Sequence, residues 1–151
     1  MKAVFEIVDR YLEASCCSGL LYAPLDKPLT YRQTRRYTLD FEGDESAASD
    51  FVSKTLLDEV AQDLHRGEDA ALSDFQFVID YGMKPGALDL EKEAVVGYYE
   101  HLDGPAFKLN DLKIEQRVYV FGDESAKSDN FVKDICNRAI HTWSVIDGVK
   151  S

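Results

Sequence analysis

The chain has 151 residues, of which 45% are hydrophobic and 11% aromatic, and its formal net charge is −11. This composition predicts a single folded domain over residues 1–151, and no apolar run reaches the roughly 20 residues that a membrane-spanning helix needs. The excess of acid repels phosphate backbones and anionic lipid surfaces, which argues against nucleic-acid and membrane binding.

The first segment, residues 2–15, has apolar side chains at helical spacing. Val4, Phe5, Val8, Tyr11 and Leu12 recur at intervals of three and four, so the pattern predicts an amphipathic helix. Charged residues interrupt the segment, which therefore lacks the continuous apolar centre of a secretory signal, and we expect a cytoplasmic protein. The odd number of cysteines, two of them adjacent, favours reduced thiols over a disulfide framework.

The next segments predict a strand followed by a helix. Residues 30–41 alternate between two faces, one of which carries Tyr37, Leu39 and Phe41, so they predict a half-buried strand. A second helix is expected after residue 44. Its apolar face extends from Phe51 to Leu64, and Gly67 ends it.

The rest of the chain predicts three strands and one helix. The strands are expected at 74–81, 94–101 and 112–121, with a loop at 82–93. The last helix begins at the second GDES phrase, after Asp123, includes Trp143 in its apolar stripe and ends at Gly148. The predicted order α-β-α-β-β-β-α favours an α+β fold with one four-stranded, largely antiparallel sheet and helices on one face, for which a ferredoxin-like connection is one option.

One phrase occurs twice, as GDESAASD at residues 43–50 and as GDESAKSD at residues 122–129. Each copy lies where a predicted strand ends and a predicted helix begins, so we interpret it as an internal strand-turn-helix duplication with pseudo-repeat units around 30–66 and 110–147. Asp44 and Asp123 suit the N-cap position, and the following glutamates suit the first helical turn. The alternative is a pair of metal sites built from the carboxylates of Asp44, Glu45, Asp50, Asp123, Glu124 and Asp129.

Signatures of catalysis are missing from the sequence. The histidines His65, His101 and His141 lie far apart, and no H-x-x-x-H, C-x-x-C, G-x-S-x-G or phosphate-binding glycine loop occurs. We therefore expect no catalytic residues and no cofactor.

Two regions are candidates for ligand or partner binding. The first is a basic island, Lys27, Arg32, Arg35 and Arg36, which is either an anion-binding or partner-docking patch or a charged strand paired with local acids. The second is the loop 82–93 with Lys84 and the neighbouring Tyr98 and Tyr99, because recognition residues concentrate on loops.

Three functions are compatible with these patterns. The first is a non-enzymatic acidic module of inhibitor, antitoxin-like or adaptor type that binds a protein partner, which the net charge suggests is basic. The second is a small-molecule-binding domain with a pocket between sheet and helices. The third is a metal-dependent enzyme that uses the duplicated acidic junctions. Homo-oligomerisation through an exposed strand is compatible with each of them.

Overall fold

The computed structural model describes residues 2–9, 15–16, 29–58, 60–67, 70–72, 75–84, 87–102, 104–122, 128–137 and 139–147. The strands are β1 (Lys2–Asp9), β2 (Ser15–Cys16), β3 (Thr30–Gly43), β4 (Gln62–Arg66), β5 (Phe77–Met83), β6 (Phe107–Phe121) and β7 (His141–Asp147). The helices are α1 (Glu45–Thr55), α2 (Leu90–Glu100) and α3 (Ser128–Ile135).

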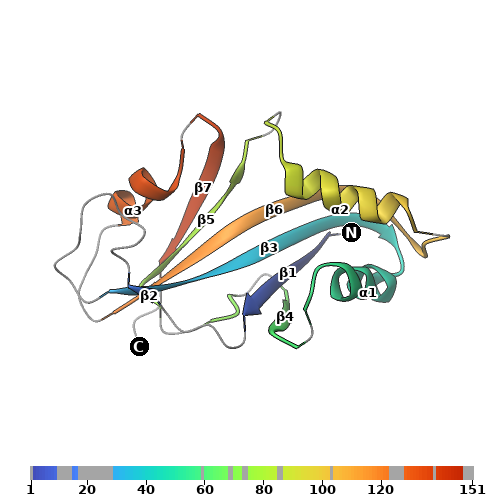
Figure 1. Ribbon diagram of the computed structural model, residues 1–151, viewed down its shortest axis with the longest axis horizontal. Helices are drawn as coiled ribbons and strands as arrows, with labels where there is room; N and C mark the ends of the chain where they lie inside the picture. Colours follow the sequence, from blue (N-terminus) through green and yellow to red (C-terminus); the bar gives the residue numbers. More distant parts are fainter. Residues whose placement is uncertain are drawn as a thin grey trace.

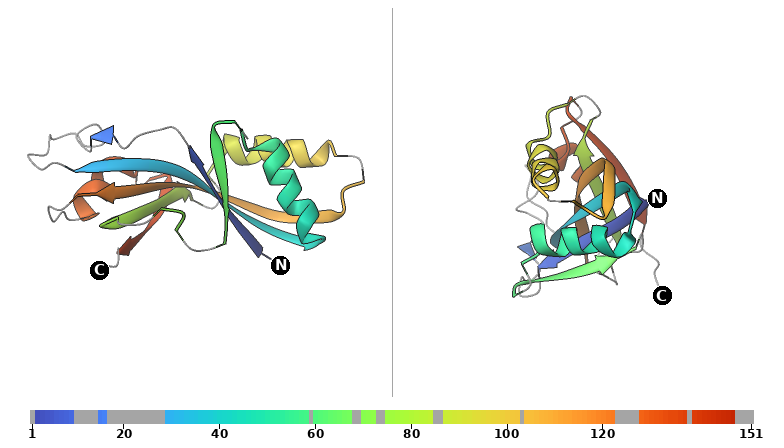
Figure 2. Two further views of the ribbon diagram at one scale, coloured as in Figure 1. Left: turned by 90° about the horizontal axis from the view of Figure 1, so that it is seen from below. Right: turned by 90° about the vertical axis from the view of Figure 1, so that its right-hand side faces the viewer.

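All of the strands belong to one antiparallel sheet. Six of them follow the order β4-β1-β3-β6-β5-β7, and the short β2 pairs with β3 outside this path. The long strands β3 and β6 form the centre of the sheet and extend through the length of the molecule (Figure 1; Figure 2). The predicted four-stranded sheet and its ferredoxin-like order are therefore wrong.

The predicted N-terminal helix is a strand over the part that the structure describes. In β1, Phe5 and Ile7 face one side of the sheet and Val4 and Val8 face the other, and all four are buried. A strand that is buried on both faces loses the alternation that identifies most strands. Its run of apolar residues then also satisfies helical spacing, which explains the wrong prediction.

The predicted strand at 94–101 is wrong too, because this segment belongs to α2. Valine and tyrosine pairs favour a strand by propensity, but the start of the helix is well defined. The Asp89 side chain caps it by accepting a hydrogen bond from the Lys92 N–H at 3.1 Å. Val95 and Tyr99, one helical turn apart, then pack on the core beneath.

Both of the other predicted helices are too long. The helix expected to end at Gly67 stops at Thr55, and β4 follows it; the helix expected to end at Gly148 stops at Ile135, and β7 follows it. Trp143 accordingly lies on a strand instead of a helical stripe. The cause is the same in both cases, since a tight turn brings the chain back as an edge strand.

These two turns make the same hydrogen bonds. The Asp58 N–H donates to the side chain of Gln62, and the Asp58 carboxylate accepts from the backbone N–H two residues later. In the second turn, the Asn137 N–H donates to the ring of His141, and the Asn137 side-chain oxygen accepts from the backbone N–H two residues later. The backbone carbonyls of Asp58 and Asn137 also each accept hydrogen bonds from the backbone N–H groups three and four residues later. The turns are thus fixed by a short polar side chain that binds its own backbone.

The two halves of the sheet contain the same kinds of elements in the same order along the chain, and their strands follow the same order from each edge to the centre. The series β1-β3-α1-β4 forms one half, with the sheet order β4-β1-β3, and β5-β6-α3-β7 forms the other, with the order β7-β5-β6. Helix α2 stands between β5 and β6 in the chain. The predicted repeat units contain β3-α1-β4 and β6-α3-β7, and their origin by duplication stays a prediction.

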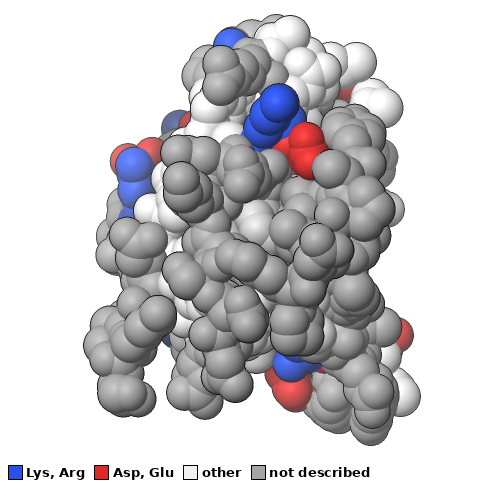
Figure 3. All heavy atoms as spheres, turned by 90° about the vertical axis from the view of Figure 1, so that its left-hand side faces the viewer, with Lys and Arg blue, Asp and Glu red and all other residues white. Residues whose placement is uncertain are grey.

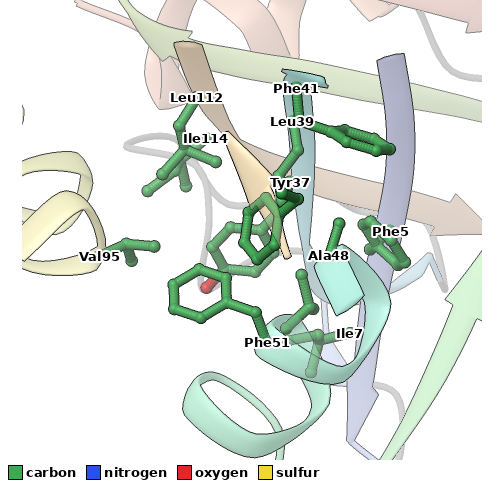
Figure 4. Packing of buried hydrophobic residues seen from close by; sticks show 12 residues of the cluster. Phe5, Ile7, Tyr37, Leu39, Phe41, Ala48, Phe51, Val95, Leu112 and Ile114 are labelled. Atoms are coloured by element: carbon green, nitrogen blue, oxygen red, sulfur yellow. The ribbon is translucent and has the colours of Figure 1, made fainter. Parts of the chain in front are cut away.

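Two apolar clusters lie on the same face of the sheet. The register pairs Tyr37 with Ile114 and Gln33 with Val118, so these side chains share one face. At one end, side chains of β1, β3 and β6 converge on α1 and α2, with Phe51 at the centre of the cluster (Figure 4). At the other end, Phe131 of α3 packs on β5 and β6. Among the described helices, none has the length and hydrophobicity needed to cross a membrane.

Candidate functional site

The face of the sheet opposite the helices carries a buried cluster of ionised groups. Arg117 donates to both carboxylate oxygens of Asp80, at 2.6 and 2.8 Å, and to Glu6 at 2.9 Å. Glu6 also accepts from Thr34 and Tyr119. Glu6, Asp80 and Arg117 are each at most 2% exposed, so the cluster is closed to solvent. It can stabilise the register of four adjacent strands, but it cannot bind a ligand from solution.

The electrostatics of this cluster follow from burial and pairing. Burial alone lowers the pKa of Arg117, yet its hydrogen bonds and the charge of Asp80 raise that pKa well above the ordinary value. Burial and the hydrogen bond to Glu6 raise the pKa of Tyr119 to about 12. Both groups therefore keep their protons at neutral pH.

The described arginines of the basic island each contact an acidic residue or a carbonyl. Arg32 donates to the backbone oxygen of Asp9 at 2.8 Å, and Arg36 lies 3.4 Å from Glu115. Arg35 lies on the helix-bearing face and forms an exposed ion pair with Glu91 at 3.4 Å. On another face, some of the visible basic side chains also stand beside acidic ones (Figure 3). Lys27 lies outside the described residues.

The acidic junctions are described in the first copy only. Asp44 is the N-cap of α1 and accepts from the Ser46 N–H at 2.9 Å, whereas Glu45 and Asp50 point into solvent. Gly43 has a φ of +113°, which lets the chain turn from β3 into the helix. Asp123 and Glu124 lie outside the described residues, and so does the side chain of Asp129. Within the described part of the chain, no group of three or more potential ligands could hold a metal ion.

The candidate residues Lys84, Tyr98 and Tyr99 do not form one site. Tyr99 packs against Phe107 and donates its hydroxyl to the Phe107 carbonyl at 3.1 Å, so it belongs to the core. Tyr98 is exposed on α2, and Lys84 is exposed just after β5. The structure therefore gives Tyr99 a packing role and leaves the other two on the surface.

A polar cavity of about 450 Å³ lies on the helix-bearing face, beside the middle of β3. Gln33 and Gln116 meet across it through a hydrogen bond of 3.1 Å, and Tyr37 forms part of its wall. Burial raises the pKa of Tyr37, which keeps the phenol neutral. This cavity is where the expected pocket between sheet and helices would lie, although its described walls hold no charged side chain that is buried.

A second hollow, which we call the α2–β7 groove, has an apolar floor and an acidic rim. It has a volume of about 290 Å³. Its floor includes Tyr81 and Ile114, and burial raises the pKa of the Tyr81 phenol. The N-terminal end of α2 contributes the acidic residues of the rim. The full lining is Tyr81, Gly82, Met83, Leu88, Asp89, Leu90, Glu91, Ile114, Gln116 and His141.

Exposed apolar side chains lie on the α2 side of this groove and along the neighbouring strand β7. Of the nine large hydrophobic residues that are exposed in the described chain, six fall within residues 88–90 and 140–146. Leu88 and Leu90 are 62% and 71% exposed and lie on the α2 side of the groove. Trp143 and Val145 of β7 are each 38% exposed. Monomeric proteins seldom leave such residues together without a partner.

Strand β7 is an edge of the sheet. It pairs with β5, and no further described strand follows it in the sheet order (Figure 1). An edge strand presents unpaired backbone N–H and C=O groups that can bind another strand. Groove and edge together form the candidate functional surface.

Sequence reasoning found one side of this surface, because the predicted recognition loop 82–93 contains Leu88, Leu90 and other residues of the groove. It missed the β7 side because it assigned the chain from the second GDES phrase to Gly148 to one helix. The alternating pattern of His141, Trp143 and Val145 was the available signal, since period two is typical of a strand. Comparison with protein-family models, with curated proteins and with solved structures finds no match to the chain.

Proposed function

We propose that the protein is a non-enzymatic module that binds a protein partner through the α2–β7 groove and the adjoining β7 edge. The observation that carries this proposal is that six of the nine exposed large hydrophobic residues of the described chain lie in two short segments, residues 88–90 before and at the start of α2 and residues 140–146 in and beside β7. Catalysis has less support, because Glu6, Asp80 and Arg117, the most deeply buried ionised groups of the described chain, are paired with one another and closed to solvent.

The chemistry of the groove indicates the kind of partner. Its floor suits an apolar side chain, and Asp89 and Glu91 on its rim favour basic residues next to that side chain. The net charge of −11 extends the same preference to long range, because it attracts a basic partner and repels an acidic one. The ligand is therefore a protein segment with an apolar anchor and a positive charge.

The test compares capture by the wild-type chain and by a Leu88→Ser/Leu90→Ser variant. Tagged protein is used as bait in an extract of cells that express it naturally, and the captured proteins are quantified by mass spectrometry. Burying one leucine contributes about 1.5–3 kcal/mol, so the double variant should bind its partner about 100-fold more weakly or worse.

A matched control replaces apolar surface away from the groove. Leu102→Ser removes a leucine that is exposed beyond the end of α2, so its capture should equal that of the wild type. Equal capture by the wild type and the groove variant would show that the groove is not the docking site. Binding of the captured protein is then remeasured with both purified components.

A further inference from the structure

We infer that the β7 edge binds a second copy of this chain, by antiparallel pairing of β7 with β7 around a twofold axis at Ser144. The inference rests on the proposed function, because it names one occupant of the proposed binding surface. The partner of the groove is a separate protein.

The two edges of the sheet differ in their protection against strand pairing. At the β4 edge, Asp63 and Arg66 are exposed charges, a feature that hinders the approach of another strand. From His141 to Ile146 the β7 edge has no Asp, Glu, Lys or Arg, and its one such residue is Asp147 at the end of the strand. It presents Trp143 and Val145 on one face, and Ile146, which is 43% exposed, on the other.

Symmetry restricts the possible registers. Residues that oppose each other in an antiparallel pair lie on the same face, so a twofold axis perpendicular to the sheet must pass opposite one residue of β7. Ser144 is the middle residue of His141–Asp147, and an axis there is the one arrangement that pairs all seven residues. The strand is then used over its full length.

This register also matches the side chains. It places Trp143 of one copy opposite Val145 of the other, and an aromatic and a β-branched residue form a favourable cross-strand pair. It places Thr142 opposite Ile146 on the other face, and both of these residues are exposed in the single chain. The outermost pair places His141 opposite Asp147, so the one charged residue of the strand faces a histidine at the end of the pairing.

The protein itself provides a precedent for such a contact. The centre of its sheet is the antiparallel pair β3 and β6, which hold corresponding places in the two halves. Pairing of β7 with β7 would continue the sheet in the same manner. Because one strand pair covers less area than a standard protein interface, we expect a dimer that dissociates at micromolar concentrations.

The experiment measures mass against concentration by sedimentation velocity for the full chain of 17.0 kDa. The wild type should change from monomer to dimer across the micromolar range. Trp143→Lys and Val145→Asp each place a charge opposite an apolar residue at both ends of the pairing. Each variant alone should therefore dimerise at least tenfold more weakly.

An equimolar mixture of the two variants distinguishes this pairing from a general loss of apolar surface. In the mixed dimer, the introduced lysine faces the introduced aspartate at one end, and the native Trp143 faces the native Val145 at the other. The mixture should recover most of the lost affinity. Val60→Asp, at a position 77% exposed in the turn before β4, is the matched control and should dimerise like the wild type.

Three results would overturn the inference: a wild type that stays monomeric, a dimer that neither variant weakens, or a mixture that recovers nothing. Circular dichroism of each variant verifies that β7 remains folded. A monomeric wild type whose capture still depends on Leu88 and Leu90 would remove the second copy and leave the proposed function intact. If the wild type dimerises but its capture of a partner does not depend on Leu88 and Leu90, the second copy stands and the groove is not the docking site of the proposed function.

Discussion

The buried guanidinium of Arg117 offers the sharpest test of the forces that hold the sheet together. Replacing Arg117 with Met keeps much of the apolar volume and removes the charge. The substitution deletes two hydrogen bonds to Asp80 and one to Glu6, at 2.6, 2.8 and 2.9 Å. Glu6 retains its hydrogen bonds from Thr34 and Tyr119. Asp80 is therefore the carboxylate that loses more of the hydrogen bonds that offset its burial.

The expected cost follows from the burial of these groups. Both carboxylates are at most 2% exposed, and removing one partner of a buried ion pair costs about 3–5 kcal/mol. Domains have a free energy of unfolding of about 5–15 kcal/mol, so Arg117→Met should bring the protein close to unfolding. Adding Asp80→Leu should restore about 1–2 kcal/mol, because the orphaned carboxylate is then absent.

Urea unfolding followed by circular dichroism measures these free energies. The control is Arg35→Met, the same chemical change at an ion pair whose two side chains are 54% and 45% exposed. That pair should contribute less than about 1 kcal/mol. If Arg117→Met lowered the free energy of unfolding no more than Arg35→Met does, the cluster of Glu6, Asp80 and Arg117 would have to be hydrated. The conclusion that it is closed to solvent would then be wrong.

Two more predictions concern Tyr119 and the glycines that end strands. Because the pKa of Tyr119 rises from 10.0 to about 12 on folding, the stability it contributes is complete below pH 10 and is lost as the pH rises to 12. The loss amounts to about 2–3 kcal/mol, so urea unfolding of Tyr119→Phe should depend less on pH in this window than that of the wild type; equal dependence would contradict the pKa shift. Gly43→Ala places a methyl group 2.6 Å from the Ala106 carbonyl oxygen at a φ of +113°, whereas Gly67→Ala, at a φ of +107°, meets open space. Thermal unfolding should therefore show a larger loss for Gly43→Ala, and equal losses would mean that backbone strain alone matters.

The parts of the fold that the sequence predicts well are strands whose apolar residues lie mainly on one face. Residues 30–41 alternate clearly because Tyr37, Leu39 and Phe41 face the core while the intervening side chains are less buried, and β3 does lie there. The strand at 112–121 lies within β6 although side chains on both of its faces are buried; its second face carries the polar Glu115 and Arg117, so the sequence still alternates. When the apolar residues of a strand lie on one face, the sequence shows the period of two that is typical of strands.

The failures have two physical causes. In β1, burial on both faces removes the alternation, so Val4 and Phe5 resemble the side of a helix. Near Asp58 and Asn137, a side-chain hydrogen bond ends the helix, while apolar residues continue at spacings that suit either structure. Neither tertiary burial nor the return of the chain as an edge strand is visible in local periodicity.

The predicted recognition loop 82–93 contains the residues on the α2 side of the candidate site, whereas the β7 side was missed for related reasons. The residues of the site come from α2, β5, β6 and β7, and the sequence analysis assigned two of these elements to the wrong type. The predicted candidates Arg32 and Arg36 were recognisable by charge, yet they contact local groups of the sheet. Charge patterns in a sequence reveal where ions are, whereas an apolar surface becomes visible only when the fold shows what remains uncovered.

The difference between the two edges of the sheet is the strongest reason to place function near β7. Strands β4 and β7 hold equivalent positions in the two halves, and each follows a helix and a turn with the same hydrogen bonds. If the edges served stability alone, both would need protection by charge. Strand β4 exposes the charges of Asp63 and Arg66, whereas from His141 to Ile146 β7 has no Asp, Glu, Lys or Arg and exposes Trp143, Val145 and Ile146. An unprotected edge in an otherwise highly charged chain is explained if another strand covers it.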